Sequence, residues 1–398
     1  MQNEIKNFNV DFVPKSNDDR IMEGTYVKVT DVGEEYIVSA RGNTVILKYQ
    51  TPQIKIGGIP DPDANGGKFY RMDYALSVTE GGNYYRKCMN NQIQNNNWHT
   101  SGGTIRFRTN ADYINIIVAH QKFGAPSKRS SGRGAAGIDV YTGTGTDRIY
   151  CGKRTQAMSN PPSTVEGVTL PKGYKEVLID LPLFSGVKNV TIAFPKDSEI
   201  APPLERAFEQ PIVFYGSSLT QGAYATRPGT AYANMVCRML DVECRNLGFT
   251  DGAHGEDAAI EYLAKQDMCA FVMDYDHNTT LEELKRSHYK LYETVRAAHP
   301  DIPIVMMSKP IFTVGLDNTA PFYEDEQRIE LIKEDYNKAL ASGDKNVYFI
   351  NGYEDYFPMR SMADIYSNDF CNPNDAGMHF MGLAVYKKLA PALESKKV

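Results

Sequence analysis

The strongest constraint on the fold is a change of hydrophobic period near residue 200. Before it, apolar and polar residues alternate in short runs, as in Ile105 and Phe107, which Arg106 separates. After it, short wholly apolar runs are separated by longer stretches with a helical period. Alternation in twos is typical of half-buried strands, whereas the second pattern is typical of buried strands that helices connect. The chain is therefore predicted to have an all-β first half and an α/β second half.

In the first half, turn-forming glycine pairs separate the strand candidates, and no long helical period appears. The strand candidates are residues 45–47, 105–107, 114–118, 177–181 and 190–194. Many short strands with glycine-rich turns indicate a sandwich or jelly roll. We therefore expect a β-sandwich or jelly-roll domain over residues 1–195.

In the second half, one stretch has Leu284, His288, Leu291 and Val295 at helical spacing and ends before Pro300. The strand candidates around it are residues 212–215, 242–246, 270–273, 304–307 and 347–350. Alternation of strand and helix implies a parallel sheet with helices on both faces. We expect this domain over residues 211–398, after a proline-containing linker at 196–210.

Composition excludes several classes of protein. The 398 residues carry a formal net charge of −6, which gives no general attraction to nucleic acid. No stretch approaches the roughly 20 apolar residues that span a bilayer, so no membrane association is expected. The start of the chain has no apolar segment, which indicates a cytoplasmic protein, although a mature secreted chain would look the same. A homo-oligomer is left open.

The first candidate for chemistry is Gly216-Ser217-Ser218-Leu219, which directly follows the strand candidate at 212–215. Functional groups collect at the carboxyl ends of parallel strands, and glycine permits the tight turn that exposes a nucleophile there. The alternative is a serine-rich turn that only caps the next helix, near residues 230–240.

Three later segments, taken with this one, resemble the ordered blocks of the SGNH (GDSL) hydrolase family. They are Asn246-Leu247-Gly248-Phe249, Asp274-Tyr275-Asp276-His277-Asn278 and residues 369–377. The resemblance covers about residues 211–395 and implies a flavodoxin-like three-layer α/β/α domain. The first half resembles the jelly-roll domain that precedes the hydrolase domain in one branch of the family.

The resemblance implies that Ser218 is the nucleophile. Its own amide and the side chain of Asn278 would then donate to the oxyanion of the tetrahedral intermediate. In the second block, Asp251 stands where the family has a glycine amide donor, and Gly252 is a substitute for it. The alternative for Asn278 is a turn-former at a strand end.

The last block departs further from the family. The family pattern is Asp-x-x-His before proline, and this chain reads Asp369-Phe370-Cys371-Asn372-Pro373. Asp369 would orient a base that Asn372 replaces. Asparagine can hold a hydrogen bond but cannot accept a proton at neutral pH, so general-base activation of Ser218 is expected to fail.

Two other histidines are candidates for the missing base. His254 in the loop after the second block and His379 near the last block are the alternatives, while His277 is expected to have a supporting role and His288 a place in the core. No metal site is expected, because no histidine pair has helical ligand spacing and the cysteines form no C-x-x-C pair. A serine mechanism requires no cofactor.

These observations predict a serine ester hydrolase that acts on small acyl or acetyl esters, including saccharide esters, with activity impaired or abolished by Asn372. A second hypothesis is a non-catalytic protein that binds carbohydrates or esters in the same pocket. A third is an acyltransferase, or a hydrolase with a dyad rebuilt on His254 or His379.

Overall fold

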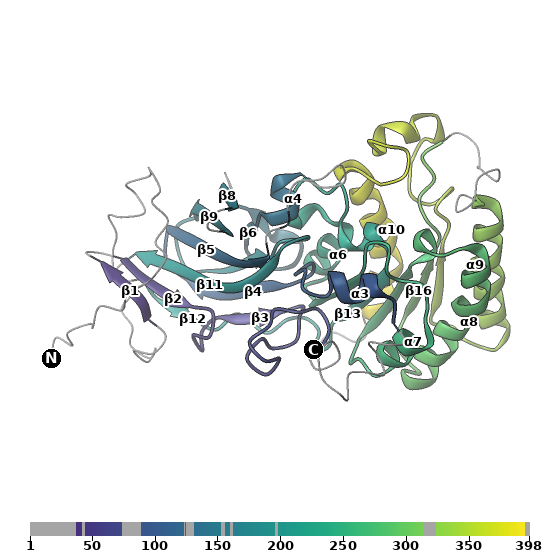
Figure 1. Ribbon diagram of the computed structural model, residues 1–398, viewed down its shortest axis with the longest axis horizontal. Coiled ribbons are helices and arrows are strands. Elements are labelled where there is room, and N and C mark those ends of the chain that lie inside the picture. Colours follow the sequence, from purple (N-terminus) through teal and green to yellow (C-terminus); the bar gives the residue numbers. More distant parts are fainter. Residues whose placement is uncertain are drawn as a thin grey trace.

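The computed structural model describes residues 37–41, 44–73, 89–122, 124, 131–152, 156–159, 162–195, 198–313 and 324–394. Within these ranges, the β-rich part and the α/β part lie side by side along the long axis of the molecule (Figure 1). No helix in the described ranges is long and apolar enough to cross a bilayer.

Two antiparallel sheets form the first part. One has the order β1-β2-β11-β5-β9-β8, and the other has the order β12-β4-β10-β6-β7 with β3 paired to β4. The strands are β1 (Ile37–Arg41), β2 (Thr44–Lys48), β3 (Lys55–Gly57), β4 (Thr104–Thr109), β5 (Tyr113–Lys122), β6 (Asp139–Thr142), β7 (Ile149–Tyr150), β8 (Gln156–Ser159), β9 (Pro162–Thr169), β10 (Lys175–Asp180), β11 (Gly186–Pro195) and β12 (Ile200–Ala201).

Alternation along the strands builds the core between these sheets. Ile105 and Phe107 of β4 are fully buried in it, whereas Arg106 lies on the other face and forms an ion pair with Glu176 at 2.8 Å. Successive strand residues point to opposite faces, so this is the pattern that the sequence predicts. The expected antiparallel β architecture is confirmed for the described residues of the first half, which also contain two short α-helices at Asn91–Asn96 and Gly132–Ala136.

The second part is a five-stranded parallel sheet with the order β14-β13-β15-β16-β17. Its strands are β13 (Ile212–Gly216), β14 (Cys244–Gly248), β15 (Ala270–Asp274), β16 (Ile304–Met307) and β17 (Val347–Ile350). β14 and β15 lie on opposite sides of β13. The strand order therefore changes direction at β13, although all five strands run parallel. In open parallel sheets, ligands bind at this switch point, outside the carboxyl ends of the strands.

Helices cover both faces of this sheet, as expected. α7 (Asp257–Ala264), α8 (Leu281–Ala298) and α9 (Asp325–Ala341) pack on one face, and α6 (Tyr232–Leu240) and α10 (Asp375–Leu393) pack on the other (Figure 1). α8 begins at a capping box of Thr280 and Glu283. Its buried face includes Leu284, Leu291 and Val295, so the predicted amphipathic helix is confirmed.

The remaining elements are short helices in the connections. They are α3 (Asn91–Asn96), α4 (Gly132–Ala136), η3 (Gly145–Asp147), α5 (Ser218–Gln221), η4 (Pro228–Thr230), η5 (Asp276–Asn278) and η6 (Arg360–Tyr366).

Two boundaries differ from the sequence interpretation. β14 begins at Cys244 rather than at Val242, because Asp241 ends α6 in a left-handed conformation and Val242 still hydrogen-bonds back to Cys237. The expected linker contains β12, which adds to the edge of the β part by pairing with β4.

Candidate active site

The serine turn is held where the sequence predicts it. Ser217 caps α5, with its Oγ accepting from the Leu219 N–H at 3.2 Å, and Ser218 is the first helical residue. A Cβ on Gly216 would lie 1.9 Å from Thr220 Oγ1, so only glycine lets the helix follow the strand so closely. Ser218 is 4% exposed. At the first position of a helix its N–H has no acceptor within the helix, which leaves it to a ligand.

A buried carboxyl group is hydrogen-bonded to this turn. Asp274, at the end of β15, accepts hydrogen bonds from Thr220 Oγ1 and Tyr232 Oη, each at 2.7 Å. Burial raises the pKa of Asp274 to about 7, although both hydrogen bonds act in the opposite direction. The turn after β13 is thus fixed to the neighbouring strand and to α6.

Two buried carboxamides tie the turn to the second block. Gln221 Oε1 accepts from the Thr250 N–H at 3.0 Å, and its Nε2 contacts His99 Nδ1 at 2.7 Å. Asn246 Nδ2 donates to the Thr220 carbonyl at 2.7 Å. This asparagine therefore ties backbone segments together, the structural alternative to a catalytic role.

A fully buried arginine of the β part binds the second-block loop, the segment from Asn246 to Gly252. The guanidinium of Arg71 donates to the carbonyls of Asn246, Gly248 and Asn96 and lies 4.3 Å from the ring centre of Phe249. Burial lowers the pKa of Arg71 to about 9, so the side chain stays charged at neutral pH. Backbone carbonyls at the end of β14 thus solvate a buried cation.

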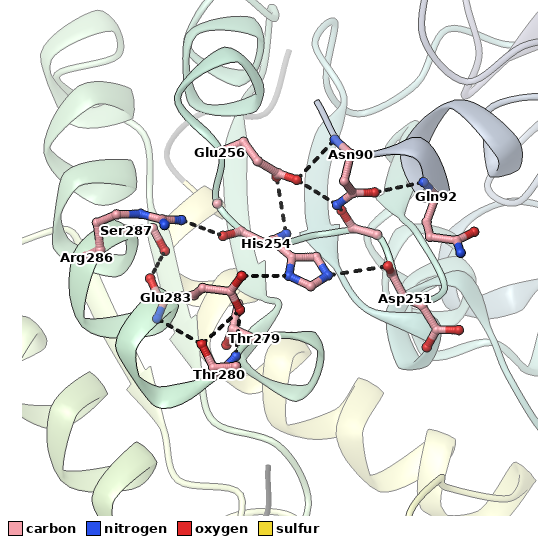
Figure 2. Close-up of polar contacts among 12 residues, drawn as sticks. Asn90, Gln92, Asp251, His254, Glu256, Thr279, Thr280, Glu283, Arg286 and Ser287 are labelled. Atoms are coloured by element: carbon pink, nitrogen blue, oxygen red, sulfur yellow. Dashed lines mark hydrogen bonds and ion pairs between the residues drawn. The ribbon is translucent and has the colours of Figure 1, made fainter. Parts of the chain in front are cut away.

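α3 and its N-cap also bind the second-block loop (Figure 2). Asn96 Nδ2 donates to the Thr250 carbonyl at 2.9 Å. Asn90 Nδ2 donates to the Gly252 carbonyl and to Glu256 Oε1. The second-block loop is therefore held by a segment more than 150 residues away in sequence.

The two expected oxyanion donors converge on one protein atom. The Gly252 N–H and Asn278 Nδ2 both donate to the Phe249 carbonyl, at 3.0 and 2.9 Å. Asp251, which directly precedes Gly252, has a φ of +54°, a left-handed conformation that favours glycine. In this conformation the Gly252 N–H is engaged within the turn, whereas the carboxamide of Asn278 carries a second N–H. Their roles toward a ligand stay predictions.

Asn372 is hydrogen-bonded to Asp369 through both its side chain and its backbone. Its Nδ2 donates to Asp369 Oδ2 at 3.0 Å, and its backbone N–H donates to Oδ1 at 2.8 Å. Asn372 is 3% exposed, and its Oδ1 has no hydrogen-bond partner among the described residues. Partial burial tends to raise the pKa of Asp369, but donors from Asn372, Cys371 and Tyr224 outweigh it and lower that pKa. Asp369 is therefore a carboxylate at neutral pH.

The alternative histidines lie apart from this arrangement. His254 Nδ1 contacts Glu283 Oε1 at 3.3 Å, and its Nε2 contacts the Asp251 carbonyl at 3.4 Å (Figure 2). His379 is exposed on α10, with its ring against Phe380. No described contact joins either residue to Ser218.

The remaining histidines of interest have protein partners. His288 is 1% exposed and contacts Asp335 at 2.8 Å, as expected for a core histidine. His277 Nε2 lies 3.4 Å from Cys371 Sγ. The sequence interpretation missed this contact, together with the hydrogen bonds of Arg71, because nothing local to these residues indicates their distant partners.

A parallel α/β/α sheet with a serine turn after its first strand is the class of fold that serine ester hydrolases use. Residues 209–390 match the model of the GDSL-like Lipase/Acylhydrolase family, and residues 80–200 match the model described as the N-terminus of Esterase_SGNH_hydro-type. The α/β part of the chain thus matches the GDSL-like hydrolases, and the β part matches the domain that precedes the hydrolase domain in esterases of the SGNH type. These matches indicate an esterase-type hydrolase.

Solved structures share the two-part architecture. A GDSL-like lipase from Bacteroides ovatus is 24% identical with a TM-score of 0.74, over 88% of this chain and 98% of that chain. The salicylyl-acyltransferase SsfX3 from a tetracycline biosynthetic pathway is 15% identical with a TM-score of 0.64, over 87% of this chain and 96% of that one.

A family two carbohydrate esterase from Cellvibrio japonicus is 11% identical with a TM-score of 0.52, over 88% of this chain and 98% of that one. At these identities the likenesses establish the fold. No curated protein matches the chain in sequence.

Proposed function

We propose that this protein is an SGNH-type serine ester hydrolase that forms a Ser218 acyl-enzyme, and that Asn372 slows the reaction because it cannot take the serine proton. The observation that carries this proposal is the 3.0 Å hydrogen bond from Asn372 Nδ2 to Asp369 Oδ2. The carboxylate that would orient an imidazole is present and engaged, while the group it orients is an amide.

In this mechanism, Ser218 Oγ attacks the ester carbonyl, and the oxyanion receives hydrogen bonds from the Ser218 N–H and the Asn278 side chain. Collapse of the tetrahedral intermediate breaks the bond to the alcohol and leaves an acyl-serine, which water then hydrolyses. Without a base the serine proton must leave to water, and loss of a triad member costs about 10³ to 10⁶ in rate.

Small acyl and acetyl esters, including acetylated saccharides, are the proposed substrates. Support comes from the family, and from the fold that the chain shares with the family two carbohydrate esterase from Cellvibrio japonicus. A buried serine at a strand end suits a small acyl group, because the carbonyl must approach Oγ closely.

A second candidate function is ester or carbohydrate binding without turnover. One specific observation favours it: the Gly252 N–H and Asn278 Nδ2 both donate to the Phe249 carbonyl. An oxyanion hole that is filled by the protein's own carbonyl stabilises a charged intermediate less well.

Hydrolysis of an aryl acetate by the wild-type protein, Asn372→His, Ser218→Ala and the double variant tests the proposal. We expect Asn372→His to be faster than wild type by about 10² or more, the usual contribution of a general base. We also expect Ser218→Ala to remove that gain. Silence in all four proteins would favour binding without turnover.

A further inference from the structure

A cysteine and a histidine meet beside the candidate active site, on the loops of the third and last blocks. Cys371 Sγ lies 3.4 Å from His277 Nε2, within hydrogen-bond distance for sulfur. Cys371 directly precedes Asn372, and His277 directly precedes Asn278. The pair therefore lies at the carboxyl edge of the sheet, where the family places its chemistry.

The thiol is accessible and reduced. Cys371 and His277 are both half-buried, whereas Cys237 and Cys244 lie in the core. Cys371 forms no disulfide. A neighbouring imidazole promotes the thiolate, which is the nucleophilic form of cysteine.

Large apolar side chains are exposed in the chain segment that leads to Cys371. Phe370, next to Cys371, is 62% exposed in a left-handed conformation. A bridge between Ser367 and Pro373 joins this loop to η6. Three more large apolar side chains are exposed in or beside η6: Met359 at 51%, Met362 at 40% and Ile365 at 50%. Exposed apolar side chains in the segment that carries Cys371 are available for contact with an apolar ligand.

We propose that Cys371, with His277 as its base, is a second nucleophile that accepts the acyl group of esters of apolar carboxylic acids. The proposal rests on the proposed function for the ester substrate class, and it does not require Ser218.

In the proposed step, His277 Nε2 takes the thiol proton and Sγ attacks the ester carbonyl. The new bond joins Sγ to the acyl carbon, and the bond from that carbon to the alcohol oxygen breaks. The imidazolium returns its proton to the departing alkoxide, so the products are an S-acyl cysteine and a neutral alcohol. Water then hydrolyses the thioester, with His277 again as the base.

The neighbouring groups set the conditions for this step. Asp369 Oδ1 accepts the Cys371 backbone N–H at 3.0 Å, whereas the group in contact with Sγ is the His277 ring, at 3.4 Å. The reactivity of Cys371 should therefore depend on His277.

The direct test uses the full chain in the Ser218→Ala background, mixed with 4-nitrophenyl butyrate and mapped by peptide mass spectrometry. We expect a butyryl adduct at Cys371. We also expect its formation to slow about tenfold or more in His277→Gln, the effect of moving a thiol pKa by one unit. His379→Ala, an exposed histidine outside the pair, is the matched control and should leave the adduct rate unchanged.

Absence of a Cys371 adduct in the Ser218→Ala background would overturn the proposal, and so would an adduct rate that His277→Gln leaves unchanged. Neither result affects the proposed function, which depends on Ser218. A second readout is the rate of alkylation by iodoacetamide, with half-buried Cys151 and Cys269 as internal references. Cys371 should react faster than both at neutral pH and lose this advantage in His277→Gln.

Discussion

The turn around Ser218 and the loop around Asn372 serve the same ligand in the proposed mechanism, but the structure builds them differently. Ser218 lies in a buried turn that Gly216 shapes and that neighbouring strands and helices fix by hydrogen bonds. The last-block loop is more exposed, has Phe370 in a left-handed conformation and leaves Asn372 Oδ1 without a partner among the described residues. Ser218 and Asn372 are both buried, but residues 368–370 before Asn372 in its loop are exposed, whereas those around Ser218 are not.

If Asn372 stands at the base position, as proposed, this difference explains how a base could be lost without disturbing the serine turn. A side chain at Gly216 would collide with Thr220 and with the Asp274 carbonyl at the end of β15. At position 372, the amide of an asparagine forms the hydrogen bond to Asp369. Catalysis and folding therefore make separate demands on the two regions.

The largest expected effect concerns the nucleophile. If Ser218 is the nucleophile, adding Ser218→Ala to Asn372→His should lower the rate of aryl acetate hydrolysis by about 10³ or more, as loss of a nucleophile does in serine hydrolases. Circular dichroism of the double variant should match that of Asn372→His. Retention of the hydrolysis rate would show that the turn is not the reacting region.

The next effect is on stability and concerns the hydrogen bonds from Arg71 to backbone carbonyls. Arg71→Met leaves three backbone carbonyls without their donor, and we expect a loss of about 3 kcal/mol in the free energy of unfolding. Urea denaturation measures it. Arg286→Met, exposed on α8, is the matched control and should change stability by less than about 0.5 kcal/mol. Equal stability of the two variants would contradict the assigned role of Arg71.

The buried carboxyl group at the serine turn should make stability depend on pH. Burial raises the pKa of Asp274 to about 7 from 3.8, so the folded state holds its proton more tightly than the unfolded state does. Its contribution is present below about pH 4 and is lost as the pH rises to about 7, by at most about 4 kcal/mol.

Unfolding of wild type and Asp274→Asn in urea, at about pH 5 and about pH 8, measures this dependence. The difference in stability between the two pH values should be smaller in the variant. An equal difference would mean that Asp274 titrates alike in both states.

The smallest effect is expected at the alternative histidines. A group that served as general base would cost about 10²-fold or more when removed, and we expect no such loss in His254→Gln or His379→Ala. The assay is aryl acetate hydrolysis by the wild-type protein. A large loss of hydrolysis in either variant would indicate that the histidine acts as the base. The proposed difference between the two regions would then be wrong.

The sequence was sufficient for the layers and for the serine turn because both depend on local patterns. Apolar runs located all five parallel strands, and Gly216 followed by Ser217 and Ser218 located the turn. Periodicity and family motifs carry no information on hydrogen bonds between distant segments. Arg71 reaches carbonyls 175 and 177 positions away, and Cys371 meets His277 across 94 positions.

The rate at which an aryl phosphonate labels Ser218 tests the central claim most directly, because it reports on activation of the serine and does not depend on the natural substrate. We predict slow labelling of the wild-type protein and labelling about 10² times faster in Asn372→His, with none at that residue in Ser218→Ala. Equal rates in wild type and Asn372→His would contradict the claim that a missing base is what limits this site.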